Sequence, residues 1–438
     1  MVQRRKLIFL SVLIGILALL QEGSAQTRRR RPTTTTKPAV IDYYDEEVDD
    51  YDGIGDVDSD PHAKGFQTGS ISSVFTDKKS FLCPLVKPAL HTGTSLANLS
   101  PEDIDVVGAM GDSLASGRGL WPPTDVDFRG AAFPIGGDAN IDGLVTIPNI
   151  LLEFNDDLEG VSHGMGDRDK LPAYQFNVGI SGSKTADELV YRMKSHVDDI
   201  DGKWAMITIT VGTEELCASC GEPSKRDIRI ALAKLRTGLP QAFIILLGPV
   251  HVASSYSQNV NLMKPRCSCL AALSKAKYTK LVRKWADIFY DVQLEFNSLN
   301  YTTFGVLAIP LLTIHSRDPN SLFTENKPLL NRKGHTYAAK WLWNRLIAGP
   351  DYNVSNAVFS EDAYYCPSVG CPYFRNPQNF EHCSILTEDD FNMIRQNLVG
   401  VIALVVGLAL IAVCLLGGAF YCHGLRATKG RFEELAGV

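Results

Sequence analysis

An uncharged apolar segment near the C-terminus constrains this chain most. Residues 398–421 form a run of about 24 apolar or small residues, long enough to cross a bilayer core of about 30 Å. Basic residues follow it, which predicts a cytosolic tail over residues 423–438. A buried core helix is one alternative, although few residues follow for it to pack on. A tail removed for a lipid anchor is another, although such signals end in their apolar stretch. We expect a transmembrane helix over residues 396–422.

The N-terminus predicts a secretory signal peptide over residues 1–25. Arg4 and Arg5 precede an apolar run from Leu7 to Leu20, and small residues end at Ala25. An uncleaved signal anchor is the alternative, but the run is short for a full span. The mean hydropathy of −0.02 excludes a polytopic membrane protein. We expect a single-pass type I protein of the plasma membrane with an extracellular ectodomain.

Cysteines and sequons fit an oxidising compartment. Eight cysteines lie on the expected outer side, and disulfides are their default state there. These are Cys83, Cys217, Cys220, Cys267, Cys269, Cys366, Cys371 and Cys383. The Cys217-x-x-Cys220 spacing also suits zinc or redox chemistry, but no second pair completes a metal site. Sequons predict glycosylation at Asn98, Asn300 and Asn353, with Pro101 disfavouring the first.

Composition divides the remainder into three parts. Residues 26–75 are Thr-rich and then acidic and Tyr-rich, which predicts a disordered arm. Arg28–Arg31 within it is a candidate processing site. Residues 76–350 carry the folded-domain pattern, and residues 351–395 predict a Cys-containing extension or stalk. The net charge of −6 gives no basic field for nucleic acid.

Strand-length apolar runs alternate with helical patterns over residues 76–350. The runs are 104–110, 205–211, 242–250 and 304–314, and the helical patterns are 227–236 and 277–299. This alternation predicts an α/β fold whose parallel sheet is covered on both faces. Functional residues in such folds lie at the carboxyl ends of the strands.

A serine follows the first of these runs. The segment Gly111-Asp112-Ser113-Leu114 places Ser113 at a strand-to-helix turn, the geometry of an exposed nucleophile. A purely structural alternative is that Asp112 and Ser113 cap the following helix.

Four blocks in order resemble the GDSL, or SGNH, hydrolase family, and most closely its membrane-associated phospholipase B branch. The blocks are residues 107–114, 177–184, 209–220 and 322–336. The resemblance implies the family's three-layer α/β fold, Ser113 as the nucleophile position and Gly182 as an oxyanion-hole position. It also implies an ester hydrolase that acts on phospholipid or lysophospholipid, without metal or cofactor.

The blocks depart from the family pattern at three working positions. Asn326 stands where the family has its catalytic Asp, Leu329 where it has His, and Glu214 where it has the oxyanion-hole Asn. Leucine cannot accept a proton, and a serine hydroxyl is a poor nucleophile until a base takes its proton. In serine hydrolases, loss of a triad member costs about 10⁴ in rate, and loss of one oxyanion donor costs ~10²–10³.

The sequence therefore predicts a catalytically impaired hydrolase, a pseudoenzyme, whose pocket retains lipid or acyl-chain binding. An active phospholipase with a non-standard base is the first alternative. His335, His315 with Asp318, and His251 are its candidates. A cell-surface adhesion or receptor module, with an unknown protein partner, is the second.

Overall fold

The computed structural model describes residues 68–70, 83–121, 124–138, 144–180, 186–254, 260–350, 352, 363–385 and 387–433. The predicted signal peptide, the basic run Arg28–Arg31, Gly182 and Asn353 lie outside the described residues. The predicted arm over residues 26–75 is corrected at its end. Thr68–Ser70 form strand β1, which pairs antiparallel with β8, Ala363–Tyr365.

A parallel four-stranded sheet forms the centre of the domain. Its strands are β2 (Ile104–Gly111), β3 (Trp204–Thr210), β4 (Ala242–Leu247) and β6 (Phe304–Ile309), in the order β2-β3-β4-β6. Neighbouring strands are parallel throughout. Nearly every residue of the four strands is buried, because helices cover both faces.

Two of the predicted strands are broken into shorter ones. The run 242–250 divides into β4 and β5 (Val250–Ala253), and the run 304–314 divides into β6 and β7 (Leu312–His315). Pro249 and Pro310 interrupt the two runs, because proline lacks the N–H that a central strand needs. Strands β5 and β7 then pair with each other as a separate parallel sheet.

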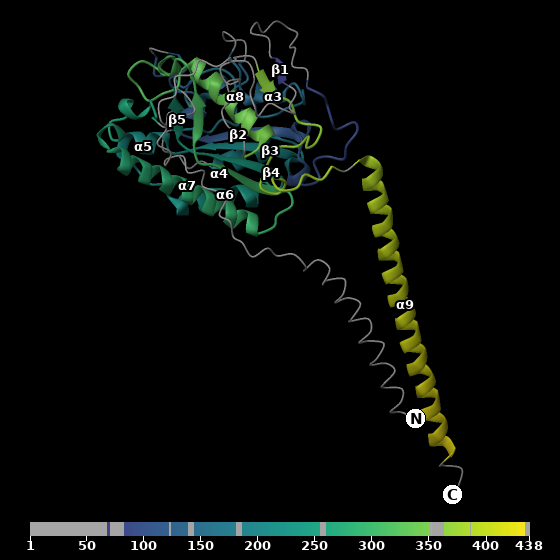
Figure 1. The fold of residues 1–438 in the computed structure, drawn as a ribbon. Helices are drawn as coiled ribbons and strands as arrows, with labels where there is room; N and C mark the ends of the chain where they lie inside the picture. Colours follow the sequence, from purple (N-terminus) through teal and green to yellow (C-terminus); the bar gives the residue numbers. More distant parts are fainter. Residues whose placement is uncertain are drawn as a thin grey trace, which may run out of the picture. The chain divides into compact units, whose positions relative to one another are not determined.

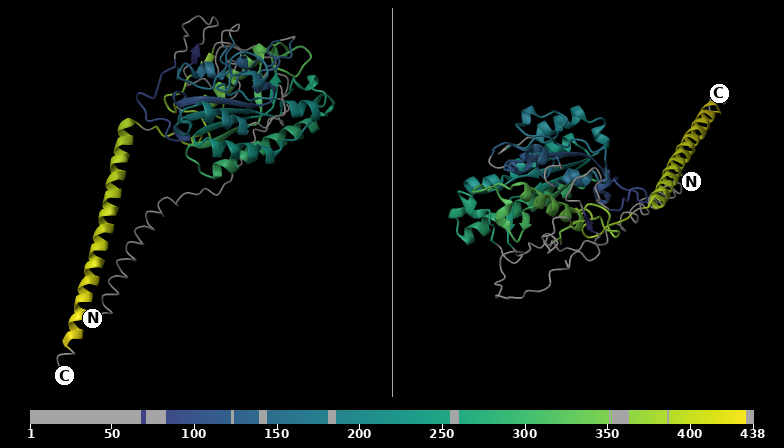
Figure 2. Two further views of the ribbon diagram at one scale, coloured as in Figure 1. Left: turned by 180° about the vertical axis from the view of Figure 1, so that it is seen from behind. Right: turned by 90° about the horizontal axis from the view of Figure 1, so that it is seen from above.

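Helices form the two outer layers (Figures 1 and 2). One layer contains α4 (Ala186–His196), α6 (Lys225–Gly238) and α7 (Lys275–Ser298), and the other contains α3 (Ile147–Leu151) and α8 (Arg332–Ala348). The short helices α2 (Ser113–Ser116) and α5 (Thr213–Ser219) follow β2 and β3. The three-layer α/β fold expected from the sequence is confirmed.

Short 3₁₀ helices occupy many of the connections. They are η1 (Leu96–Asn98), η2 (Pro101–Asp103), η3 (Arg129–Ala131), η4 (Arg168–Lys170), η5 (Ile200–Gly202), η6 (Lys264–Arg266), η7 (Leu270–Ala272) and η8 (Pro319–Leu322).

The eight predicted cysteines form four disulfides. The pairs are Cys83–Cys366, Cys217–Cys267, Cys220–Cys269 and Cys371–Cys383. The two cysteines of the C-x-x-C motif therefore bond to a second, nearby pair. This arrangement excludes the zinc and redox alternatives for that motif, since both of its sulfurs are used in structural bonds.

The predicted extension does not behave as a stalk over its described part. Tyr364, Tyr365, Tyr373 and Phe374 are all 0% exposed. The side-chain amide of Asn376, also buried, donates to the Leu96 carbonyl at 2.8 Å. This segment is therefore part of the domain core. Cysteine content and weak periodicity suggested a stalk because the packing partners lie far away in the chain.

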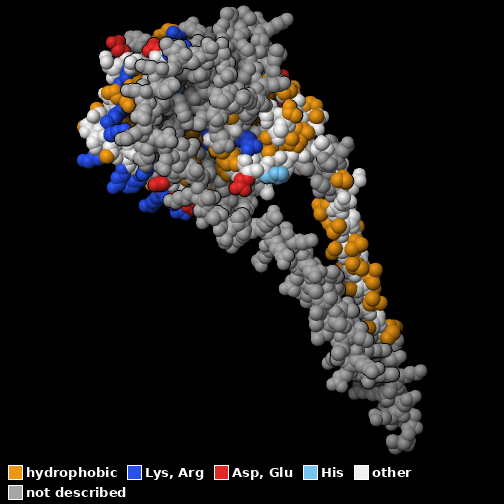
Figure 3. Space-filling view, viewed as in Figure 1, with side chains coloured by type: hydrophobic (Ala, Val, Ile, Leu, Met, Phe, Trp, Pro, Cys, Tyr) orange, Lys and Arg blue, Asp and Glu red, His pale blue; other side chains and the backbone are white. Residues whose placement is uncertain are grey.

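Helix α9 (Glu388–Glu433) contains the candidate membrane span. The most apolar window of its stretch Arg395–His423 has a mean hydropathy of 3.1, and none of that window is buried in the protein. Hydrophobic side chains follow it along its length (Figure 3). By length and composition α9 can cross a membrane, and its apolar stretch matches the predicted residues 396–422.

Candidate active site

The turn after β2 holds Ser113 in place. Gly111 has a φ of +123°, and a Cβ at this position would lie 1.8 Å from the Thr210 carbonyl oxygen, so only glycine fits. Asp112 is the N-cap of α2, and its side chain accepts the Leu114 N–H at 3.1 Å. The capping alternative is therefore correct for Asp112. Ser113, the first residue of α2, is only 2% exposed.

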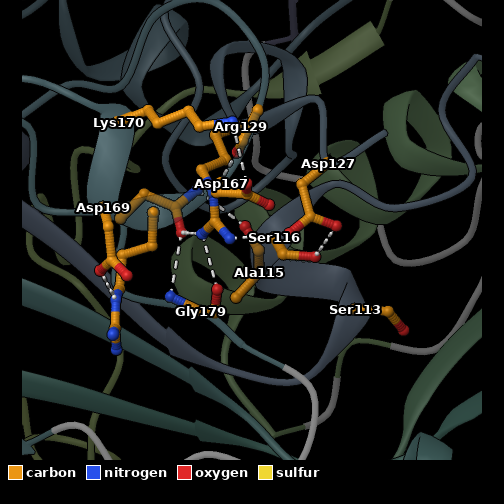
Figure 4. A network of polar contacts seen from close by, with 12 residues as sticks. Ser113, Ala115, Ser116, Asp127, Arg129, Asp167, Asp169, Lys170 and Gly179 are labelled. Atoms are coloured by element: carbon orange, nitrogen blue, oxygen red, sulfur yellow. Dashed lines mark hydrogen bonds and ion pairs between the residues drawn. The ribbon is translucent and has the colours of Figure 1, made fainter. Parts of the chain in front are cut away.

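A buried arginine fixes the segment beside this turn (Figure 4). Arg129, 1% exposed, donates to the Asn177 side-chain oxygen at 3.1 Å and to the Gly179 carbonyl at 2.6 Å. It also forms an ion pair with Asp127 at 2.7 Å. The amide of Asn177 donates to the Ala115 carbonyl in α2 at 2.9 Å. The second sequence block is thus tied to the helix that begins with Ser113.

Glu214 contacts the serine directly. It lies at the start of α5, and its Oε1 accepts the Ser113 backbone N–H at 3.1 Å. In the chymotrypsin-type serine hydrolases the nucleophile's own N–H is a donor to the oxyanion. Here the Glu214 carboxylate accepts that N–H. Glutamate in place of asparagine therefore removes an amide donor and also engages a second donor, the Ser113 N–H. It places a negatively charged group where negative charge would have to develop.

Ser113 and Glu214 line one cavity of about 400 Å³. Its remaining described walls are Ser116, Arg118, Asp125, Val126, Asp127, Gly166, Asp167, Lys170 and Ile180. Three of the acids are paired: Asp125 with Lys327 at 2.6 Å, Asp127 with Arg129, and Asp167 with Lys170 at 3.3 Å. Arg118 is exposed at this cavity and forms no ion pair within the described chain.

The charge of Glu214 also acts on a second carboxyl group, that of Asp112. Burial, and then the charge of Glu214, raise the pKa of Asp112 from 3.8 to about 7. Its Oδ2 atom has no hydrogen-bond partner. Asp112 therefore keeps its proton to a much higher pH than an ordinary aspartate, and it was not singled out from the sequence as more than a cap. Its position in the Gly-Asp-Ser motif could have drawn attention to Asp112, but the sequence does not show that its carboxyl group is buried.

The two substituted triad positions lie in a loop before α8. Asn326 is exposed with a φ of +58°, and Leu329 is half-buried. Leu329 packs against Gly119, where an added Cβ would lie 2.7 Å from the leucine Cβ. Neither residue is among the described residues that line the cavity with Ser113. Nothing at these positions can accept the serine proton.

No histidine replaces the missing base within the described structure. The buried hydroxyl oxygen of Ser113 has no hydrogen-bond partner there. His335 is 0% exposed, accepts the Phe133 N–H at its Nδ1 at 3.1 Å, and has a pKa lowered to about 3 by burial. His335 is a packing residue at the start of α8.

The other two histidine candidates lie on the small sheet. His251 is in β5 and His315 in β7, and both are buried. Burial lowers the pKa of each to about 4, and the charge of His315 contributes at His251. Asp318, proposed as the partner of His315, is exposed. Both imidazoles are neutral at pH 7, but neither bonds the serine hydroxyl.

Comparison with known proteins identifies the scaffold. A family model described as GDSL-like Lipase/Acylhydrolase matches residues 107–342, more than half of the chain. The chain belongs to this family. It is 28% identical over 340 residues to "Phospholipase B1, membrane-associated" of Mus musculus, covering 68% of this chain and 23% of the relative. The Homo sapiens protein of the same name is 28% identical over 333 residues, covering 66% and 23%.

The match spans less than a quarter of the length of these relatives. It supports membership in the phospholipase B branch of the GDSL family, as the four blocks indicated.

Within the described residues, no group of three or more His, Cys, Asp or Glu side chains could hold a metal ion.

The predicted glycosylation sites differ in accessibility. Asn300 is exposed after α7. Asn98 is 5% exposed, and its amide nitrogen, the atom that would carry a glycan, donates to the His91 carbonyl and to Thr94 Oγ1. Burial of Asn98 therefore disfavours glycosylation there, whereas Asn300 is accessible, and glycosylation stays a prediction. The Asn-Leu-Ser spacing contains no information about burial.

Proposed function

We propose that this chain is a membrane-anchored, phospholipase B-like protein that is catalytically impaired and retains lipid binding. One observation carries the proposal: the Ser113 hydroxyl lacks a base, while the Ser113 N–H is held by the Glu214 carboxylate. Both halves of the acyl-transfer machinery, proton removal and oxyanion stabilisation, are affected. The apolar stretch of α9 supports membrane anchoring. We further propose a type I orientation at the plasma membrane, supported by the basic residues after the span.

A direct assay tests the catalytic part. Purified protein and its Ser113→Ala variant are compared on short-chain p-nitrophenyl esters and on lysophospholipid, with a serine esterase of known activity as positive control. We expect the two proteins to give the same background rate, and a fluorophosphonate probe to leave folded protein unlabelled at Ser113. Ser113-dependent turnover or labelling would establish the active-enzyme alternative instead.

The cavity beside Ser113 supports the lipid-binding part. Arg118 presents a cation there with no ion-pair partner in the described chain, which suits a phosphate group. We expect a short-chain lysophospholipid, kept below its micelle concentration, to bind in calorimetry. Arg118→Glu should weaken binding by about tenfold or more, because the charge reversal repels the phosphate. Arg226→Glu, an equally exposed charge reversal on α6, is the matched control. Equal binding by both variants would contradict the role of this cavity.

A further inference from the structure

A second cavity lies on the other side of the Asp112–Ser113 turn. It has a volume of about 260 Å³ and lies between the carboxyl ends of β2, β3 and β4 and the helices α6 and α7. Neither Ser113 nor Glu214 lines it. Its described walls are Met110, Gly111, Asp112, Ile209, Thr210, Val211, Glu215, Glu222, Ser224, Asp227, Ile228, Ala231, Leu246 and Trp285.

The inner end of this cavity is buried and mostly apolar. Met110, Ile209, Leu246 and Trp285 are each at most 4% exposed. The mouth lies at the connection between α5 and α6, where Glu222 and Ser224 are exposed. A ligand entering between these two residues would therefore bury its body against aliphatic and aromatic side chains.

Two buried polar atoms in the cavity wall make no hydrogen bond of normal length: Asp112 Oδ2 and Thr210 Oγ1, in residues that are 2% and 0% exposed. The Thr210 hydroxyl is still close enough to lower the pKa of the Asp112 carboxyl as a weak hydrogen-bond donor, so both atoms belong to one end of the cavity. An unsatisfied buried carboxylate oxygen is costly, and a ligand that donates a hydrogen bond would remove that cost.

The charge of the cavity walls determines whether a cationic or an anionic ligand can bind. Four carboxyl groups line the cavity, on Asp112, Glu215, Glu222 and Asp227, and no Lys, Arg or His is among its described walls. Glu222 at the mouth is ion-paired with Lys284, and Glu215 accepts the Gly212 N–H, so the buried carboxyl of Asp112 is the group that decides which charge the site accepts. It would repel a carboxylate or phosphate head, whereas an ammonium group could donate directly to Asp112 Oδ2.

We propose that this cavity binds a small primary ammonium ligand with an apolar body, with its charged head on Asp112 and Thr210 and its body against Trp285. An engineered cavity of about 150 Å³ holds benzene, so the volume here suits an ammonium with a body of roughly seven to nine carbons. The site lies outside the Ser113 cavity and does not depend on the catalytic state of the serine.

Calorimetry with full-length protein in detergent tests the site. The probes are n-heptylammonium and, as the anionic counterpart of the same chain length, n-heptanoate, both at pH 8. A primary amine with a pKa near 10.4 is charged at that pH, and Asp112 is largely ionised. We expect saturable 1:1 binding of the ammonium only. Equal binding of heptanoate would overturn the proposal.

Variants assign the binding to this cavity. Asp112→Asn keeps the shape and the helix cap but removes the charge, and it should weaken heptylammonium binding at least tenfold. Asp125→Asn, in the Ser113 cavity, is the matched carboxyl-to-amide control and should leave binding unchanged. Unchanged affinity in Asp112→Asn, or equal losses in the two variants, would overturn the proposal.

A second pair of variants does not alter the buried carboxyl. Ala231→Leu adds bulk on the cavity wall of α6, whereas Ala233→Leu adds the same bulk to an exposed position of the same helix. We expect the first to abolish binding and the second to have no effect. Binding retained in folded Ala231→Leu would contradict the assigned cavity.

Discussion

The two sides of the Ser113 site differ in how much the fold depends on them. On the nucleophile side, the side chains of Arg129 and Asn177 are almost fully buried and bond to backbone groups of several segments. On the base side, Asn326 is exposed and Leu329 is half-buried. Residues that hold the serine also hold the domain together, whereas the side chains at the base positions contribute little beyond local packing.

This difference explains how a GDSL scaffold can be complete while its chemistry is not. Changing the side chain of Asn326 or Leu329 removes no buried hydrogen bond, so such changes should lower the free energy of unfolding only slightly. Changing Arg129 would remove the ion-pair partner of the half-buried Asp127 carboxylate and the donor to the carbonyls of Gly166 and Gly179. The structure therefore preserves the position of the hydroxyl regardless of whether a base is present.

The largest effect is expected on the nucleophile side. Arg129→Gln should lower the free energy of unfolding by roughly 3–5 kcal/mol, because it leaves Asp127 and the carbonyls of Gly166 and Gly179 without their donor. Chemical denaturation measures the change. Arg118→Gln, an exposed arginine of the same cavity, is the control and should stay within about 0.5 kcal/mol. If Arg129→Gln lowered the free energy of unfolding by less than about 1 kcal/mol, the fold would not depend more on the nucleophile side than on the base side.

Asp112 should make stability depend on pH. Its pKa is about 7 in the folded protein and 3.8 as the ordinary value, so the folded state binds the proton more tightly. Between these two values stability falls as pH rises, because the folded state must hold a buried charge. Asp112→Asn should therefore stabilise the protein at pH 8, by on the order of 4 kcal/mol from the size of the shift, and have little effect near pH 4.

Thermal unfolding from pH 4 to pH 8 measures this dependence. Asp125→Asn, which changes an exposed carboxyl group, is the control and should show the same dependence of thermal stability on pH as the unmodified protein. If the advantage of Asp112→Asn were the same at both ends of the range, the buried charge would not be its cause.

The smallest effect is expected on the base side. Asn326 has a left-handed φ of +58°, which asparagine tolerates and alanine does not. Asn326→Ala should cost about 1 kcal/mol, and Asn326→Gly should cost almost nothing. Glu325→Ala, at the exposed neighbouring position, is the control in the same denaturation series. A cost above about 3 kcal/mol for Asn326→Ala would show that this loop supports the core after all.

Much of the fold could be predicted from the sequence because its signals are local. The apolar runs that became β2 and β3, the helical spacing of α6 and α7, and the Gly-Asp-Ser turn each lie within one short segment. The stalk assigned to residues 351–395 was wrong over its described part, because Tyr364 pairs with Gly69 in the β1–β8 sheet and Phe374 packs against Phe243, both far away in the chain. Local pattern cannot report such contacts.

The sequence by itself determined the scaffold, the candidate membrane helix and the loss of a proton acceptor at position 329, because leucine lacks one in any conformation. Only the tertiary structure decided that Glu214 occupies the Ser113 N–H and that no described histidine bonds the hydroxyl. It also decided that the Asp112 carboxyl is buried beside a second, acidic cavity. These last properties depend on distances between segments about a hundred or more residues apart, and only packing of the sheet against its helices sets those distances.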